Sequence, residues 1–585
     1  MNHTLHRTTP ARLTEQAASK LPRWLLVSVG LVYILAGLFF RDPWKSDDVI
    51  GIATMLSPLQ EQGSSWLLPS IGTFAYPQNG PLASWAGSLS IVVFGPLLEL
   101  FLSPLDATIT AARLPNILWF LILTFCFWRA LFMLAQTRAA QPLALPFGGE
   151  PNPRDYARMI ADAGLLLLVA TVGIIWRVHE TSAVPLSLAL TAMLFFGWAL
   201  MLRYPYIATL LIGLALGASF LNRALIGFIP LLLSSLVAFT VLPALAAFRR
   251  YLLLSLLIAA ALIVPWLLAA WQHNSLWVEA WWQWHLNQFQ GLSGYSLSSS
   301  TRDLLWFLWP TWPLALLALW NWRSWWRAPH IGLAAILAFF GLVLVLLMPQ
   351  AFEPEYIFLA LPSAVLAAFA LPTLRRGAIN ALDWFAVMCY SLTAATVWLG
   401  WIAQQTGWPP KIARSIQRQT EGFNSEILWF ALVIATTGTV LWLLLVHWRL
   451  TRRPPSLWRG TVLSAAGLIT TWLLLVTLWM PTLNYARSYR EVAHELSLAL
   501  AQYNTNNDCV YASINPGQRA SFYVFNRLQF SHHRGCALWL QETSPKLSIE
   551  ERNQSIPHQA ELLWQGRRGG DRNELFRLLR IPQAD

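Results

Sequence analysis

The chain has 585 residues, of which 56% are hydrophobic and only 12% are charged. Soluble proteins carry about 25% charged residues, so this composition excludes an ordinary water-soluble enzyme and predicts a polytopic membrane protein. The net charge of +12 does not indicate nucleic-acid binding, because most Lys and Arg residues stand at the ends of apolar segments, as they do in cytoplasmic loops.

The first 23 residues are polar and basic, and the apolar run 24–40 follows them. A secretory signal begins in the same way, but here the sequence RDPWKSDD follows the run instead of a small-residue cleavage site. We therefore expect a cytoplasmic N-terminal segment, 1–23, and a retained first membrane helix that opens a transmembrane domain over 24–480.

Further apolar segments have about the 20 residues that span a bilayer. They lie near 82–102, 114–136, 158–176, 183–202, 205–221, 224–243, 250–271, 303–321, 330–349, 354–371, 381–403, 426–447 and 459–480. From residue 114 onward the arginine clusters fall on one side, which the positive-inside rule assigns to the cytoplasm. The N-terminus shares that side only if one early segment does not cross. Segment 82–102 contains Gly95, Pro96 and Glu99, and we expect it to lie along the interface, which leaves about thirteen crossings.

The C-terminal part, 481–585, is then outside the cytoplasm. It holds 22 of the 68 charged residues, the composition of a soluble domain. Strand-like runs (CVYASI, ASFYVF) and helical ones (SYREVAHELSLALAQY, ELFRLLR) predict a small α/β domain. Cys509 and Cys536 are its two cysteines. In an oxidising compartment they would form a disulfide, and two free thiols are the alternative. The pair His532-His533 is expected at the surface rather than at a metal.

Acidic residues are rare in the membrane part and concentrate in one loop. Residues 41–480 contain seventeen acids, and Asp42, Asp47, Asp48 and Glu61 fall within 21 residues after the first helix. This first external loop, 41–81, is rich in Trp and Pro, which indicates that it folds against the membrane surface. We expect a functional role for Asp47, although a solvated loop could carry such acids for no special reason.

Other polar residues are predicted to reach the same external face. Charged groups at membrane depth are costly and usually mark a substrate path or a partner, although each one alone could be interfacial. The candidates are His179, Glu180, Asn222, Arg223, His285, Arg302, Glu353, Glu355 and Tyr356.

The sequence has no phosphate-binding glycine loop, HExxH, paired CxxC or GxSxG, which argues against nucleotide hydrolysis and zinc-protease chemistry. An enzyme that works outside the cytoplasm has no nucleotide-activated donor. It would need a donor already loaded on a lipid carrier.

Several motifs, taken in order, resemble lipid-linked-sugar glycosyltransferases of the GT-C superfamily, in particular the aminoarabinose-transferase and protein-mannosyltransferase-like enzymes. RDPWKSDDVIGIA resembles the DE-type motif of the first external loop, and WLLPSIGTFAYPQNGPLASW resembles the WLVP…PY…KPPLYYW segment. TAARLPN, LALGASFLNRALIG and PEYIFLALPSAVLAA resemble later elements of the group. The resemblance runs through roughly residues 25–370.

This resemblance implies a mainly α transmembrane bundle of GT-C type with a small α/β extracytoplasmic domain. It places Asp47 at the catalytic aspartate position and Asp48 at the neighbouring acid, with Glu180 as our candidate for a second acid. The expected substrate-binding residues are His179, Arg223 (a lysine in the family), His285, Arg302 and Tyr356.

Two departures from the family pattern concern the sugar and the metal. The Glu-Lys before Pro-Pro-Leu reads Gln78-Asn79, and the first of those prolines is Gly80. That region helps to bind donor or metal in aminoarabinose transferases, so neither that sugar nor that metal site is assumed. No cofactor is certain, and a divalent metal ion held by His285 with an acid is an open alternative.

The implied activity is inverting transfer of a sugar from a polyprenyl-phosphate donor to a lipid, glycan or protein acceptor. It would occur at the periplasmic face of a bacterial inner membrane, as in cell-envelope or lipopolysaccharide modification, with membrane lipids as partners. Two alternatives stay open. One is a lipid-linked saccharide flippase or transporter, although the sequence shows no internal repeat. The other is an inactive GT-C homologue, against which the retained Asp47 argues.

Overall fold

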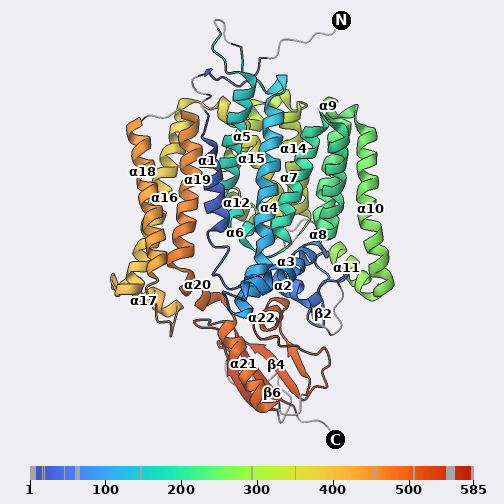
Figure 1. Cartoon of the computed structure of the whole chain (residues 1–585), viewed down its shortest axis with the longest axis vertical. Helices are drawn as coiled ribbons and strands as arrows, with labels where there is room; N and C mark the ends of the chain where they lie inside the picture. The colour runs from blue at the N-terminus through green and yellow to red at the C-terminus, as the bar shows by residue number, and fades with distance from the viewer. Residues whose placement is uncertain are drawn as a thin grey trace.

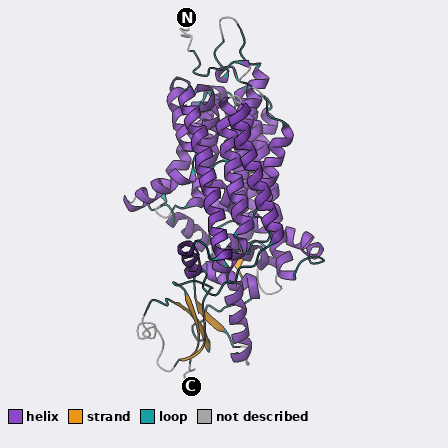
Figure 2. Cartoon of the chain, turned by 90° about the vertical axis from the view of Figure 1, so that its left-hand side faces the viewer, coloured by secondary structure: helices purple, strands orange, loops and turns teal. Residues whose placement is uncertain are grey.

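The computed structural model describes the whole chain except residues 1–7, 16–17, 19, 45–46, 60–65, 145–147, 292–293, 349–350, 453–455, 505–507, 548–559 and 582–585. Glu61, one of the four clustered acids, lies outside the described residues. Long helices run side by side in one bundle, with a sheet-containing domain beyond one end (Figures 1 and 2). The mainly helical fold class predicted from composition is confirmed.

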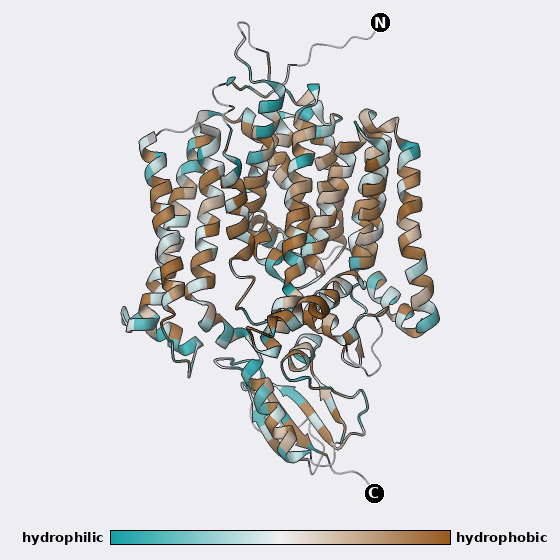
Figure 3. Cartoon of the chain, in the orientation of Figure 1, coloured by the Kyte–Doolittle hydropathy of each residue, from teal (hydrophilic) through white to brown (hydrophobic). Residues whose placement is uncertain are grey.

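In the part of the chain that the structure describes, fourteen helices, most of them apolar, form the bundle. They are α1 (Arg23–Leu35), α4 (Pro104–Ala135), α5 (Pro153–Val169), α6 (Val172–His179), α7 (Ala183–Met201), α8 (Pro205–Val241), α10 (Arg249–His273), α12 (Gly294–Phe307), α13 (Thr311–Asn321), α14 (Pro329–Leu347), α15 (Glu353–Ala370), α16 (Arg376–Thr406), α18 (Trp429–Arg452) and α19 (Ser456–Leu478). Brown apolar residues dominate their length in Figure 3.

Nine helices among the described residues are long and apolar enough to cross a membrane, and two bent pairs, α5 with α6 and α12 with α13, raise the number to eleven. The chain is therefore a multi-pass membrane protein.

Helix α8 contains two residues with non-helical dihedral angles, Arg223 and Ala224. Residues eight positions apart in a continuous helix are separated by about 12 Å, yet a Cβ at Gly227 would lie 2.8 Å from the Ser219 carbonyl oxygen. The chain reverses there, so α8 is two antiparallel limbs, as the two predicted segments require. The second limb of α8 and the shorter apolar helix α1 correspond to two more of the predicted apolar segments.

Short elements at the lower end of the bundle in Figure 1 build the surface next to the C-terminal domain. They are α2 (Asp47–Leu56), α3 (Leu82–Leu98), α11 (Ser275–Asn287), α17 (Pro410–Gln419), α20 (Met480–Arg487) and the hairpin of β1 (Ser70–Ile71) and β2 (Phe74–Ala75). Helix α3 lies across this end with apolar side chains exposed, among them Leu89 and Val93. Single turns complete the list: α9 (Pro243–Ala246), η2 (Ser57–Leu59), η3 (Arg138–Ala140), η4 (Arg323–Trp325) and η5 (Leu371–Thr373).

Helix α1 ends at Leu35, five residues before the predicted end of the first apolar run. The indole of Trp472 donates a hydrogen bond to the Ala36 carbonyl at 2.6 Å, which satisfies one of the carbonyls left over at a helix end. Gly37 follows with a φ of +85°, a backbone conformation that favours glycine. The remaining apolar residues form the descending loop that leads to α2.

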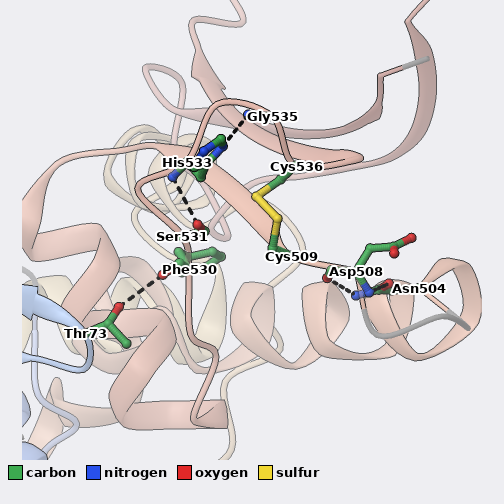
Figure 4. The surroundings of a disulfide bond; sticks show 9 residues. All are labelled: Thr73, Asn504, Asp508, Cys509, Phe530, Ser531, His533, Gly535 and Cys536. Carbon is green, nitrogen blue, oxygen red and sulfur yellow. Dashed lines mark hydrogen bonds between the residues drawn. A yellow bond between two sulfur atoms is a disulfide. The ribbon is translucent and has the colours of Figure 1, made fainter. Parts of the chain in front are cut away.

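The C-terminal domain combines a four-stranded sheet with two helices. The strands are β3 (Val510–Ser513), β4 (Leu538–Thr543), β5 (Glu561–Gly566) and β6 (Leu575–Arg580), in the order β3-β4-β6-β5, and the helices are α21 (Arg490–Tyr503) and α22 (Pro516–Asn526). The β3–β4 pair is parallel and the other two pairs are antiparallel. Cys509, just before β3, forms a disulfide with Cys536, just before β4 (Figure 4).

Two local predictions in this domain were wrong. ASFYVF is helical, because Asn515 caps the helix in a capping box with Gln518, and such a cap outweighs the strand propensity of the aromatic residues. ELFRLLR is strand β6, because it pairs with β4 on one side and β5 on the other. The first five of its six residues are buried, on both faces of the sheet, so the strand shows no alternation of apolar and polar residues.

Candidate functional site

Two cavities lie next to each other at the end of the bundle that carries the C-terminal domain. The smaller cavity, of about 70 Å³, is lined by Asp47, Thr54, Tyr76, Gln78, Arg223 and Trp284, among others. The larger cavity, of about 740 Å³, is lined by Trp44, Trp176, Arg177, Glu180, Glu353 and Arg487, among others. Asp47 lines the first and is bonded to Arg177, which lines the second. This ion pair therefore forms part of the wall between the cavities.

Asp47 is the first residue of α2, and its side chain is 35% exposed. One carboxylate oxygen accepts a hydrogen bond from Arg177 Nη1 at 3.1 Å. Burial raises the pKa of Asp47 above its ordinary value, while the positive charges of Arg177 and Arg223 act in the opposite direction. A carboxylate that is both reachable and more basic than usual is suited to accept a proton.

Asp48, the next residue, has a different environment. Its carboxylate binds Arg41 and Arg113, each at 3.1 Å, and accepts the backbone N–H of Thr181 at 2.7 Å. Burial alone would raise the pKa of Asp48, but the two arginines and the Thr181 amide outweigh it and lower the pKa. This carboxylate is fully engaged, and it ties the start of α2 to α4 and to the loop after α6.

Arg177, near the end of α6, connects three acidic side chains. Besides Asp47 it binds Glu180 at 2.7 Å and Glu353 at 2.6 Å. A single guanidinium carries one positive charge and cannot neutralise three carboxylates, so an ionised state of all three is unfavourable. Burial raises the pKa of Glu180, which lies in the loop after α6, to about 8, with Arg177 opposing the shift and Asp47 adding to it.

The reversal in α8 places Arg223 at the smaller cavity. Its guanidinium binds Glu355 at 2.6 Å and the carbonyl of Pro354 at 2.9 Å. The preceding residue, Asn222, accepts the N–H of Gly80 at its backbone carbonyl at 3.0 Å. The turn of α8, the start of α15 and the external loop are thereby held together around one cavity.

Gly80, where the sequence resemblance implies a proline, has a structural reason to be glycine. A proline has no N–H and could not donate the hydrogen bond to Asn222. A Cβ at this position would also lie 2.1 Å from the backbone carbonyl oxygen of Leu221. The close approach of the two backbones therefore requires glycine here.

His285, on α11, is completely buried, and neither ring nitrogen has a hydrogen-bond partner among the described residues. It packs edge-on against Trp281 and Trp284. Burial and the nearby Arg223 lower the pKa of His285 to about 3, so the ring is neutral at pH 7. A neutral imidazole is the form that binds a metal. However, no group of three or more His, Cys, Asp or Glu side chains gathers in metal-binding geometry in the described part of the chain.

Three predicted substrate-binding residues lie outside both cavities. His179 is buried, and its two ring nitrogens face the backbone carbonyls of Ile175 and Tyr33, one of which can accept the single N–H of a neutral ring. Tyr356 is buried and donates its hydroxyl to the Ala351 carbonyl at 3.3 Å. The side chain of Arg302 is 74% exposed and pairs with the adjacent Asp303. By contrast, Asp47 and Arg223 line the smaller cavity and Glu180 lines the larger one, and His285 lies buried next to Trp284.

Sequence reasoning missed Arg177, although its neighbours His179 and Glu180 were selected. The signal that could have found it is a charged residue in the last turn of an apolar helix. It also missed Arg487 and Arg568, which reach the larger cavity from α20 and from the turn after β5. More than 400 residues separate Arg490 from Asp42, yet these two pair at 2.6 Å and dock the C-terminal domain beside the cavity.

Comparisons with known proteins agree with the fold. No protein-family model matches the chain, and no curated protein matches it. Two solved structures are similar over nearly the whole length. ArnT from Cupriavidus metallidurans bound to undecaprenyl phosphate has 17% identity and a TM-score of 0.62, and the match covers 95% of this chain and 97% of that one. The apo state of the same protein has 15% identity, a TM-score of 0.59 and the same coverage. The chain therefore has an ArnT-like fold, and the predicted architecture, a helical membrane bundle with a small C-terminal α/β domain, is confirmed.

Proposed function

We propose that this protein is an integral-membrane glycosyltransferase that moves a sugar from a polyprenyl-phosphate donor to a lipid, glycan or protein acceptor. The observation that carries the proposal is the position of Asp47, a reachable carboxylate in the wall between two cavities. Transfer needs a donor and an acceptor on either side of one proton-accepting group, and this arrangement provides both places. The ArnT-like fold supports a lipid-linked donor, because one of those structures holds undecaprenyl phosphate.

In the proposed reaction, an acceptor hydroxyl attacks the anomeric carbon of the donor sugar from the side opposite the phosphate. The bond from that carbon to the phosphate oxygen breaks, a bond to the acceptor oxygen forms, and the configuration is inverted. Asp47 takes the proton of the acceptor hydroxyl, a contribution of about 10²–10⁴ in rate. If the acceptor is an already ionised phosphate, Asp47 instead orients it or stabilises positive charge on the sugar.

The leaving polyprenyl phosphate gains negative charge, which fixed cations stabilise best when they are already in place. Arg223 is suited to this task, since its bonds to Glu355 and Pro354 hold it at the smaller cavity. On the other side, Trp44 and Trp176 stack with ring centroids 5.3 Å apart and line the larger cavity. Such an aromatic surface suits the apolar face of a sugar.

We assign the protein to the inner membrane of a bacterium, with both cavities and the C-terminal domain on the periplasmic side. The support is the charge asymmetry: the predicted cytoplasmic arginine clusters lie in connections at the end of the bundle away from the C-terminal domain (Figure 1).

The test is a transfer assay with purified wild type and Asp47→Asn, each supplied with lipid extract that contains radiolabelled polyprenyl-phosphate sugars. Asp155→Asn is the matched control, because Asp155 is a half-exposed acid that pairs with Lys20 far from the cavities. Wild type and control should move label to an acceptor, and Asp47→Asn should not. Equal transfer by all three would remove Asp47 from the chemistry and make Glu180 the next candidate. Labelled lipid that binds but is never transferred would favour a flippase or an inactive homologue.

A further inference from the structure

Helix α17 lies at the end of the bundle that carries the C-terminal domain, between the spans α16 and α18 (Figure 1, lower left). Aromatic side chains flank it where those spans end. Trp408 is 67% exposed, and Trp429 and Phe430 at the start of α18 are 70% and 61% exposed. Exposed Trp residues at helix ends mark the level of the lipid headgroups. Helix α17 is therefore at headgroup depth.

The two faces of α17 differ in character. Ala413 is buried, and Ile412 and Ile416 are half-buried on the face toward the protein. The opposite face carries Lys411, Arg414 and Arg418, which are all exposed and, at i, i+3 and i+7, form one stripe. Among the described residues, none of the three forms an ion pair with an acidic side chain.

The turn that follows β5 extends this stripe. The side chain of Arg572 donates to the backbone carbonyl of Arg418 at 3.1 Å. Gly570 packs so closely that a Cβ there would lie 2.1 Å from the Gln419 carbonyl oxygen. Arg567 and Arg572 are exposed in this turn. We call the resulting surface the α17 basic surface: Lys411, Arg414, Arg418, Arg567 and Arg572.

Acidic groups near this surface do not cancel its charge. Asp571 and Glu574 are bound by Arg568, which points to the larger cavity. Glu421 and Glu426 follow the helix, and the backbone carbonyl of Glu421 accepts the Tyr485 hydroxyl at 2.6 Å. Glu491 is a third exposed acid, because it acts on Tyr485 together with Glu421 and Arg567. Five exposed cations thus stand against three exposed carboxylates at the level of the headgroups.

Lysine and arginine are normally depleted on the external side of membrane proteins, so a basic stripe there requires a partner. We propose that the α17 basic surface binds the phosphate groups of anionic phospholipids in the leaflet that faces the C-terminal domain. Arginine pairs with phosphate through two parallel N–H···O bonds, and a stripe of cations at the surface attracts anionic lipid. Bound lipid would hold α17 and the turn that carries Arg568 against the membrane. This proposal does not depend on the transferase activity.

The test compares lipid retention by native mass spectrometry. Detergent-solubilised full-length protein is mixed with phosphatidylglycerol or phosphatidylcholine, and the retained lipids are counted. The variant is R414Q/R418Q, because glutamine keeps the helix, and the matched control is R534Q/K546Q, which removes two exposed cations elsewhere on the C-terminal domain. Wild type and control should retain phosphatidylglycerol in preference to phosphatidylcholine. R414Q/R418Q should bind phosphatidylglycerol at least about fivefold more weakly.

Unchanged phosphatidylglycerol binding by R414Q/R418Q would overturn the proposal. So would full displacement of the lipid by inorganic phosphate at a concentration where chloride of equal ionic strength has no effect, since the site would then bind free phosphate. If the variant does not fold, the wild type supplies a second readout. Its preference for phosphatidylglycerol should fall with rising salt, because exposed charges are screened, and a salt-independent preference would contradict the proposal.

Discussion

The guanidinium of Arg177 lies 3.1 Å from the carboxylate of Asp47, although 130 residues separate them in the chain. The same guanidinium binds Glu180 and Glu353. The acid expected to act as a base is therefore part of a four-residue charged network, and its basicity depends on how the other two acids share the single cation. The first two predictions concern this network.

Replacing Arg177 with Met should strongly destabilise the protein. The substitution leaves up to three carboxylates without their shared cation, and breaking a buried ion pair on one side costs about 3–5 kcal/mol. We expect a lower melting temperature in detergent, and partial recovery in R177M/E180Q/E353Q, where two of the carboxyl groups left without Arg177 are replaced by neutral amides. R203Q, an exposed arginine bonded to Gln136, is the control and should melt like wild type. A triple variant no more stable than R177M would contradict the network.

Transfer activity should fall above about pH 8, and Glu180→Gln should abolish that fall. The pKa of Glu180 is raised to about 8, so the neutral form is the one present in the folded protein at pH 7. Glutamine imitates that form and should preserve the rate below about pH 7. Ionisation above pH 8 adds a negative charge that competes with Asp47 for Arg177.

The raised pKa of Glu180 should also make the stability of the fold depend on pH. A raised carboxyl pKa stabilises the fold below the ordinary carboxyl pKa, and this contribution is lost as the pH rises through about 8. The melting temperature of the wild type should therefore decline as the pH rises from the ordinary carboxyl pKa of 4.5 to about 8. The melting temperature of Glu180→Gln should not decline in this way. If the two proteins have identical pH profiles of rate and of melting temperature, then Glu180 does not ionise in this pH range.

Asp48→Asn should affect folding, whereas Asp47→Asn should affect chemistry. The Asp48 side chain is 7% exposed and compensates Arg41 and Arg113, each 1% exposed. Loss of its charge leaves two buried guanidinium groups without a carboxylate, at a cost of about 3–5 kcal/mol. We expect a lower melting temperature for Asp48→Asn and a wild-type one for Asp47→Asn.

The contribution of Asp48 to the stability of the fold should depend on pH. Its pKa is lowered, so the stabilisation is present above the ordinary carboxyl pKa and is lost as the pH falls toward the lowered value. Acid unfolding should therefore be less steep in Asp48→Asn than in wild type. If acid unfolding is equally steep in the two proteins, the proposed stabilisation by the pairing of Asp48 with Arg41 and Arg113 is excluded.

Gly80→Ala should disturb the smaller cavity. The new Cβ would meet the Leu221 carbonyl oxygen at 2.1 Å, so the external loop or the turn of α8 must move, and Arg223 moves with that turn. We expect reduced transfer activity with a modest loss of stability, and a larger loss for Gly80→Pro, which also lacks the N–H bonded to Asn222. Gly377→Ala is the control, since a Cβ there meets nothing within 4 Å. Wild-type activity of Gly80→Ala would contradict this close contact.

Local sequence patterns predicted the membrane part better than the soluble domain. The segments 205–221 and 224–243 correspond to the two limbs of α8, because hydropathy over about 20 residues decides whether a segment enters a bilayer. In the C-terminal domain, ASFYVF and ELFRLLR were assigned to the wrong element type. There a helix cap and pairing on both sides of a strand override the propensity of a short segment.

The sequence by itself determined the class of the protein, the apolar segments of the membrane part and the acidic loop after the first helix. Hydropathy and charge act segment by segment, so each of these can be read without knowing which helices touch. Only the tertiary structure decided that Asp47 is reachable while Asp48 is bound by two arginines. It also decided that His179 serves packing and that Arg177 joins three acids. Such pairings depend on the positions of α2, α6 and α15 relative to one another, and the free energy of a buried charge depends on those neighbours rather than on its place in the chain.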